Sequence, residues 1–145
     1  MTKFYRILIS IIFILGFNNI SLSKENFFNE GLKLFKNKKY DDAKFLLERS
    51  IVFNPKHSNS YLYLAKIYET EENEIEEEKN LNTTLLLDPN NEEAIYMLIN
   101  IKLEKSDIKK VKELTEKFQI ICETLCSKLN SIDERLSNID VNNES

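Results

Sequence analysis

Apolar residues recur along the chain at intervals of three and four positions, the spacing that places side chains on one face of an α-helix. Where the pattern begins, Phe27, Gly31 and Leu34 put a small residue between two large ones. A second helix can come close at that small residue because no side chain intervenes. Ala43 offers a matching small residue on the next apolar stretch. The pattern therefore predicts paired helices and an all-α fold.

The pattern returns with a period of 34 residues. Pro55 and Pro89 are separated by this interval, and each follows a stretch with helical spacing. Proline cannot continue a helix and pushes the preceding residue toward an extended conformation, so the chain must turn after each unit. A shift of 34 positions also superposes residues of like size: Phe27 on Tyr61, Gly31 on Ala65, Leu34 on Tyr68 and Leu47 on Leu81.

These residues resemble the pattern of the tetratricopeptide-repeat (TPR) family, whose repeat is a helix-turn-helix with a large residue, a Gly or Ala, an aromatic, a second small residue and a Pro at set intervals. The resemblance implies an all-α, TPR-type helix-turn-helix array, with repeats at residues 24–57 and 58–91. The first repeat carries Phe27, Gly31, Leu34, Tyr40, Ala43, Leu47 and Pro55, and the second carries Tyr61, Leu64, Ala65, Tyr68, Leu81 and Pro89.

A third, degenerate repeat is expected at residues 92–125. Ile99 stands at the position of its small residue and Lys102 at that of its aromatic residue. From Ile108 an apolar stripe continues to Leu136, which indicates either one long helix or two helices with a break near the cysteines. We expect residues 126–138 to form a C-terminal capping helix over the open end of the array, and residues 139–145 to be a disordered polar tail.

Glu77 departs from the pattern, because it stands where the first repeat has Ala43. A buried carboxylate without a partner is costly, so we expect the helix either to start late or to splay there. The segment from Glu69 to Glu78 is strongly acidic. It is either a patch that would bind basic partners or a solvated loop and helix N-terminus, which Asn73 can cap and whose dipole favours carboxylates.

The first 23 residues differ from the rest of the chain. Lys3 and Arg6 precede an apolar run from Ile7 to Phe17, and small residues follow at Ser21 and Ser23. This arrangement is typical of a cleaved secretory signal peptide, which we place at residues 1–23. The alternative is an uncleaved membrane anchor, although the apolar run has only about half of the roughly 20 residues that a spanning helix needs.

Charge argues against nucleic acid as a partner. The formal net charge of −4 becomes −6 when residues 1–23 are removed, because they contain two basic residues and no acidic one. A nucleic-acid-binding protein needs a basic face to neutralise phosphates. Lys, Asn and Ile are abundant, as in proteins from AT-rich bacterial genomes, so with the signal peptide we expect a secreted protein of a bacterial periplasm. Contact with a membrane is expected only through an uncleaved signal segment.

No group of residues points to an enzyme, and we expect no catalytic residue, cofactor or metal. His57 is the only histidine and follows Pro55 in a turn, where a surface or capping role suits it better than that of a base or ligand. The sequence contains no Gly-rich phosphate loop, Ser-His-Asp set or metal-ligand spacing.

Cys122 and Cys126 are the only cysteines, and in an exported protein an even count suggests a disulfide. Residues four apart in a regular helix have Cβ atoms about 5–6 Å apart, whereas a bridge needs about 3.5–4.5 Å. We therefore predict one intramolecular bridge, which requires a local break in the helix. The alternatives are free thiols, with Cys122 in the apolar seam, and a redox pair, which the spacing disfavours because it is not C-x-x-C.

The resemblance also implies a binding surface, because the first helices of successive TPR units line a concave groove. We expect a protein or peptide ligand there, with an apolar helix favoured by the apolar first unit. Phe28 and Leu32 stand where the family's chaperone-tail clamp needs polar groups, which disfavours such a tail. Alternatively, Phe28 and Phe35 pack against the N-terminal tail or a second copy of the chain. The expected groove residues are Phe28, Leu32, Phe35, Leu62, Lys66, Glu69, Tyr96, Asn100 and Leu103.

Three functions follow from these features. The first is a non-enzymatic scaffold that binds a protein or peptide. The second is a self-assembling module that forms a homo-oligomer. The third is a small redox or assembly helper that uses the cysteine pair. A fold hosts many functions, so the fold alone does not choose among them.

Overall fold

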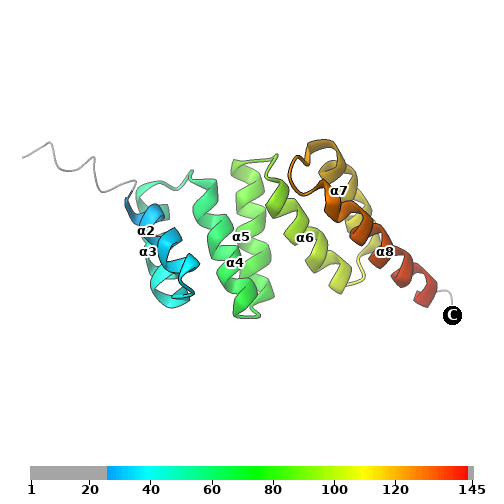
Figure 1. The fold of residues 1–145 in the computed structure, drawn as a ribbon, viewed down its shortest axis with the longest axis horizontal. Coiled ribbons are helices and arrows are strands. Elements are labelled where there is room, and N and C mark those ends of the chain that lie inside the picture. Colours follow the sequence, from blue (N-terminus) through cyan, green and yellow to red (C-terminus); the bar gives the residue numbers. More distant parts are fainter. Residues whose placement is uncertain (1–25, 144–145) are drawn as a thin grey trace, which may run out of the picture. The chain divides into compact units, whose positions relative to one another are not determined.

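The computed structural model describes residues 26–143, which form seven α-helices and one short 3-10 helix (Figure 1). The predicted signal segment at residues 1–23 lies outside the described residues. Within 26–143, no helix is both long and apolar enough to cross a membrane. The helices are α2 (Asn26–Lys36), α3 (Tyr40–Phe53), α4 (Ser58–Thr70), α5 (Glu74–Leu87), α6 (Glu92–Glu104), α7 (Ile108–Ile121), the 3-10 helix η1 (Cys126–Lys128) and α8 (Leu129–Asn143).

The described residues divide into two compact units, with the boundary between Pro55 and Lys56. In the first unit, α2 and α3 form one helix pair with a close approach at Gly31. A Cβ atom placed on Gly31 would lie 3.1 Å from Cγ of Leu47, so a side chain there would have to displace Leu47. Both Ala43 and Leu47 are fully buried. The predicted approach of the two helices at their small residues is confirmed.

The second unit contains the remaining helices and a larger core. α4 pairs with α5 and α6 with α7, while α6 also contacts α5 and α8. Because α6 is covered by three helices, most of its side chains are buried, and this helix is the centre of the unit. The core residues are Leu62, Ala65, Leu81, Ala94, Ile95, Met97, Leu98, Ile99, Ile101, Leu103, Val111, Leu114, Phe118 and Ile132.

The turns within the three helix pairs share one backbone conformation. Lys38, Glu72 and Ser106 have φ angles of 59°, 55° and 54°, and they follow one another at intervals of 34 residues. After each of them, a backbone N–H reaches back five residues to a carbonyl, as from Lys39 to Leu34 at 3.0 Å. A left-handed residue with this bond is a common way to end a helix. The 34-residue period therefore extends to the third helix pair, α6 with α7.

The third predicted repeat forms a helix pair, α6 with α7, although it lacks the small and aromatic residues of the expected pattern. Ile99 and Val111, at the two positions where the first unit has Gly31 and Ala43, are both fully buried. Lys102, at the aromatic position, forms an ion pair with Glu78 of α5. Larger apolar residues and an ion pair thus occupy the positions that the family gives to small and aromatic ones.

The C-terminal stripe forms two helices with a break at the cysteines. α7 ends at Ile121, and Cys122 has extended backbone angles. Ile132 of α8 is buried in the core, and Leu136 and Ile139 pack partly against it. α8 continues to Asn143, which corrects the expected end at residue 138, because Ile139 extends the apolar stripe by one more turn. Residues 144–145 lie outside the described residues.

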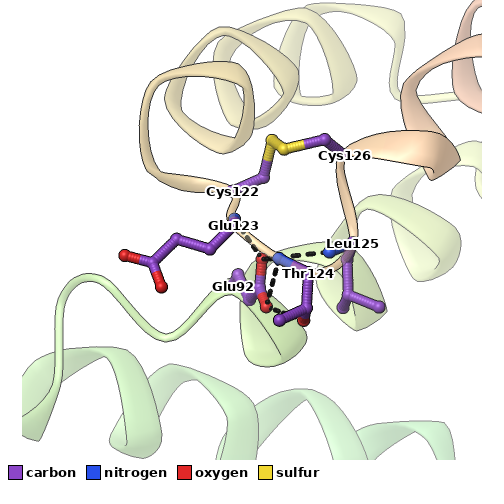
Figure 2. Close-up of a disulfide and its surroundings, with 6 residues drawn as sticks. All are labelled: Glu92, Cys122, Glu123, Thr124, Leu125 and Cys126. Carbon is purple, nitrogen blue, oxygen red and sulfur yellow. Dashed lines mark hydrogen bonds between the residues drawn. A yellow bond between two sulfur atoms is a disulfide. The ribbon is translucent and has the colours of Figure 1, made fainter.

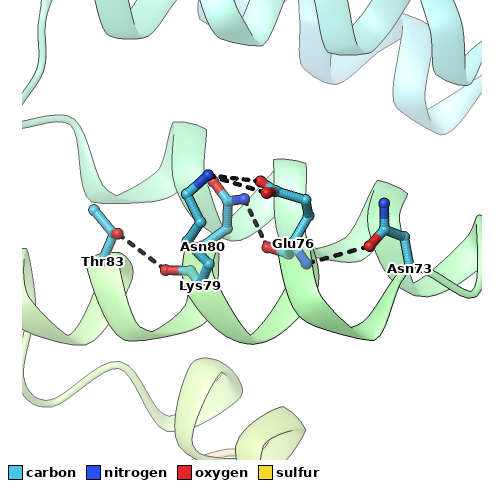
Figure 3. A network of polar contacts seen from close by, with 5 residues as sticks. All are labelled: Asn73, Glu76, Lys79, Asn80 and Thr83. Carbon is cyan, nitrogen blue, oxygen red and sulfur yellow. Dashed lines mark hydrogen bonds and ion pairs between the residues drawn. The ribbon is translucent and has the colours of Figure 1, made fainter.

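Helix α5 is largely polar and satisfies many of its polar groups internally (Figure 3). The side chain of Asn73 caps the helix by accepting from the N–H of Glu76, as predicted. The Asn80 amide donates to the Glu76 carbonyl at 2.7 Å, and the Thr84 hydroxyl donates to the Asn80 carbonyl at 3.0 Å. Buried polar groups need such partners, so these bonds let a polar helix pack in the unit.

Candidate functional site

In the first unit, the predicted groove residues lie on one face of α2. Phe28, Leu32 and Phe35 follow helical spacing, and each is half-buried. The ring of Phe35 lies 5.6 Å from that of Tyr40, which holds it against the start of α3. This face is apolar, and each of its three side chains keeps part of its surface exposed.

In the second unit, the structure separates the predicted groove residues into two groups. Lys66 and Glu69 of α4, and Tyr96 and Asn100 of α6, keep exposed surface. Leu62 and Leu103 are only 4% and 3% exposed, and both belong to the core. Their expected role as contact residues is corrected, because side chains buried in the core offer almost no surface to a ligand.

The C-terminal segment contributes two basic side chains to this surface, Lys128 from η1 and Arg135 from α8. Arg135 donates to Asn100 Oδ1 at 2.7 Å. The ammonium of Lys128 lies 5.8 Å from the centre of the Tyr96 ring, which in turn packs 6.0 Å from the ring of Phe118. The sequence indicated a capping helix, but no spacing signal indicated that this helix would contact the predicted groove residues of α6.

Glu77 is buried in α5. Its backbone N–H donates to the Asn73 carbonyl at 3.0 Å, but its carboxyl group forms no hydrogen bond or ion pair with another residue in 26–139. α5 begins at Glu74, directly after the Asn73 cap, so the expected late start or splay of the helix is wrong. Burial first, and then the nearby carboxylates of Glu69 and Glu104, raise the pKa of Glu77 to about 7. The carboxyl group holds a proton through the mildly acidic range, and this lowers the cost of its burial.

We expect Glu77 to make the folded protein less stable as the pH rises. Its folded-state pKa of about 7 exceeds the ordinary 4.5, so between these values the unfolded chain releases the proton while the folded chain keeps it. The contribution to stability is thus greatest below pH 4.5 and is lost as the pH rises through 7. Glu77 keeps 7% of its surface exposed, so the total loss is about 1–2 kcal/mol, less than the full shift implies.

Glu77→Gln removes this titration. Relative to the parent, the variant should gain about 1–2 kcal/mol in the free energy of unfolding between about pH 4.5 and pH 8, measured by urea denaturation. Glu116→Gln, at an exposed position of α7, is the control and should show no comparable change with pH. A difference between Glu77→Gln and the parent that stayed constant across this range would contradict the assignment.

The two cysteines close a short loop between α7 and η1 (Figure 2). The structure joins Cys122 to Cys126 by a disulfide, with Cα atoms 5.2 Å apart. The helix is broken at this point, as the Cβ separation in a regular helix requires for a bridge.

Glu92, the first residue of α6, holds this loop (Figure 2). Its carboxylate accepts from the backbone N–H groups of Glu123 at 2.8 Å, Thr124 at 3.2 Å and Leu125 at 3.3 Å, and from the Thr124 hydroxyl. The Thr124 hydroxyl bond and then the backbone bonds hold the pKa of Glu92 below its usual range. The contact spans more than 30 positions of the chain, so periodicity could not have revealed it.

Comparisons with known proteins give the fold of the chain. No family model matches the sequence, and no curated protein matches it. Among solved structures, the type III secretion chaperone SycD of Yersinia enterocolitica, in complex with a peptide of the translocator YopD, has a TM-score of 0.72 at 14% identity, over 87% of this chain and 99% of that one.

Two further structures are similar. The TPR2B domain of yeast Sti1, in complex with pHsp70, has a TM-score of 0.72 at 15% identity, over 81% of this chain and 98% of that one. The first TPR of Spaghetti (RPAP3), bound to the HSP90 peptide SRMEEVD, has a TM-score of 0.68 at 18% identity, over 81% of this chain and 95% of that one. The chain therefore has an all-α, TPR-like fold of paired helices.

Proposed function

We propose that the protein is a non-enzymatic scaffold that binds a segment of another protein. The observation that carries this proposal is the half-buried apolar face of α2, formed by Phe28, Leu32 and Phe35, in a TPR-like fold. Three similar structures hold a peptide or a partner protein. Aromatic side chains on an accessible face are the usual anchors for a peptide.

The side chains on α2 and α4, each taken by itself, favour an apolar ligand over an acidic one. The α2 face is apolar, so it suits an apolar, helical segment. Lys66 on α4 forms an ion pair with Glu93 at 2.7 Å and lies 4.6 Å from the centre of the Tyr63 ring, so its charge is already compensated. This disfavours a ligand held by free lysines, such as an acidic chaperone tail.

The double substitution Phe28→Ser with Phe35→Ser tests the proposal. Partners retained by the full chain from a bacterial envelope fraction are identified by mass spectrometry, and the binding segment is then made as a synthetic peptide. We expect the double variant to bind that peptide at least about tenfold more weakly, because each lost aromatic anchor weakens binding by about 1 kcal/mol or more.

A matched control separates binding from folding. Phe45→Ser removes an aromatic side chain that is 58% exposed on α3, and it should leave the affinity unchanged. Circular dichroism should show the same helix content in all variants. Undiminished affinity of the folded double variant would rule out the α2 face as the binding surface.

We also propose that the protein is exported to a bacterial periplasm. The basic, apolar and small residues at positions 1–23 support export. The disulfide between Cys122 and Cys126 supports an oxidising compartment, because such bonds persist there and are rare in the cytosol.

Self-assembly is a second candidate, favoured by exposed apolar residues on α3. Phe45, Val52 and Phe53 are 58%, 78% and 46% exposed. Phe53 stacks on Phe27 at 5.3 Å, and the guanidinium of Arg49 lies 4.5 Å from the centre of the Phe27 ring. An exposed apolar patch of this kind is a common interaction site. Sedimentation that reveals a concentration-dependent dimer would favour this function over the first.

A further inference from the structure

The break between α7 and α8 lies in a segment whose sequence does not require one. Residues 122–128 contain neither glycine nor proline, the residues that most often end a helix. The apolar stripe crosses the break at unbroken helical spacing, through Cys122, Leu125, Leu129 and Ile132. The segment is therefore compatible with one continuous helix, and contacts rather than helix-breaking residues keep the two helices apart.

The disulfide is the first contact that holds the break (Figure 2). The Cα atoms of Cys122 and Cys126 lie 5.2 Å apart. In a regular helix the Cβ atoms of residues four apart are about 5–6 Å from each other, beyond the roughly 3.5–4.5 Å that a bridge spans. The bridge and a continuous helix through this segment thus exclude each other.

The carboxylate of Glu92 is the second contact, and it takes the backbone donors that a continuous helix needs (Figure 2). It accepts from the N–H groups of Glu123 at 2.8 Å, Thr124 at 3.2 Å and Leu125 at 3.3 Å. In a continuous helix the same three groups would donate to carbonyls four residues earlier, on α7. The last such bond of α7 starts from the N–H of Cys122. The two arrangements therefore compete for the same donors.

A continuous helix would carry α8 away from the core. The end of α7 lies beside the start of α6, because the loop that follows α7 bonds to Glu92. At a rise of 1.5 Å per residue, Ile132 would lie roughly 16 Å beyond the last residue of α7. It would leave the core together with Leu136 and Ile139, which pack partly against it in the structure. The apolar side chains of α8 and the surface of α6 that they cover would then both face water.

We propose that the bridge between Cys122 and Cys126 keeps α8 on its own chain, and that its reduction lets α7 and α8 join into one helix whose α8 part packs on α6 of a second copy. The inference goes beyond the proposed function and does not depend on it. Exchange of an identical element between two copies remakes the same contacts, so the apolar surfaces of α8 and α6 are buried again. The partner that fits the uncovered α6 is for this reason a second copy of the chain.

The bridge is open to reduction by a dithiol. Cys126 is exposed and Cys122 is half-buried. The dithiol transfers two electrons to the bridge, the bond between the two sulfur atoms breaks, each sulfur takes one proton, and the dithiol closes to its own disulfide. After this step only the contacts of Glu92 oppose the continuous helix in the linking segment.

Sedimentation of the full chain, with and without a dithiol, gives the first test. After refolding from urea at several protein concentrations, we expect the reduced chain to form more of a species with the mass of two chains than the oxidised chain does. Cys122→Ser with Cys126→Ser should match the reduced chain and should keep at least the helix content of the parent by circular dichroism. Equal dimer fractions in the oxidised and reduced chains, or loss of helix in the double variant, would overturn the inference.

A cross-link distinguishes an exchanged α8 from any other dimer contact. Asn100→Cys and Arg135→Cys are added to the double variant, because these two side chains meet at 2.7 Å between α6 and α8. A short bismaleimide then joins the two introduced thiols. We expect links between two chains, which a denaturing gel shows as the mass of two chains. Links within one chain only would overturn the inference, even if the protein dimerised through the exposed residues of α3.

Two substitutions of Glu123 in this cross-linking variant control for the continuous helix. Glu123→Pro suits the break, because the preceding Cys122 has a ψ angle of 137°, and it blocks a continuous helix. We expect it to restore links within one chain, although it removes one of the bonds to Glu92. Glu123→Ala removes the same side chain but keeps the N–H group, and it should retain links between chains. Identical linking in both variants would show that helix continuity does not drive the exchange, and this would also overturn the inference.

Discussion

Phe118→Ala is expected to lower the free energy of unfolding by about 3–5 kcal/mol, the cost of removing a large aromatic side chain from a packed core. Phe118 is fully buried, belongs to the core of the second unit and packs beside Tyr96. Its removal leaves a cavity next to the central helix α6. Urea denaturation followed by circular dichroism measures the change.

Ile120→Ala is the control for this prediction. Ile120 lies two positions away on the same helix but is 85% exposed, so its loss should change stability by no more than about 0.5 kcal/mol. If both substitutions destabilised the protein equally, α7 would not present Phe118 to the core as the structure describes.

Gly31→Val is expected to destabilise the first helix pair by about 1–3 kcal/mol through overpacking. A Cβ atom at this position would lie 3.1 and 3.3 Å from two carbons of Leu47 and 3.4 Å from the carbonyl oxygen of Ala43. Leu47 is fully buried and has little room to move, and the branched side chain of valine adds two further carbons. Thermal unfolding by calorimetry measures the effect.

Asn29→Val controls for the helix propensity of valine. Asn29 is exposed on α2, so this substitution introduces the same side chain without a contact to α3. Its cost should stay within a few tenths of a kcal/mol, the difference in helix propensity. Equal destabilisation by both variants would show that the close approach at Gly31 does not limit packing.

The sequence predicted the helix pairs because the signals for them are local. These signals act within a few turns of the chain. They are the three- and four-residue spacing of apolar residues, the capping residue Asn73, and a proline after each of the first two repeats. The period of 34 residues then located equivalent residues in successive units. Gly31 and Ala43 were predicted as the small residues of a close helix approach, and a Cβ atom on Gly31 would lie only 3.4 Å from the carbonyl oxygen of Ala43.

The site was less predictable because burial depends on distant parts of the chain. Leu62 and Leu103 occupy helix positions that the TPR resemblance led us to expect in a groove, yet here they lie in the core. Glu77 shows the same limit, because residue type argued against burial while packing between α4 and α6 enforced it. The contact of Arg135 with Asn100 joins residues 35 positions apart, and no periodic signal encodes it.

The left-handed residues Lys38, Glu72 and Ser106 show that the repeat of this fold is kept in its backbone geometry. Their φ angles fall between 54° and 59°, although one residue is basic, one acidic and one a small alcohol. None is glycine, the residue that adopts this conformation at least cost. What recurs is a bend of fixed geometry at a fixed interval, and not a side chain. Homologous chains that keep these bends can differ in the residues that form them. Such chains would keep the same fold after their sequences have diverged.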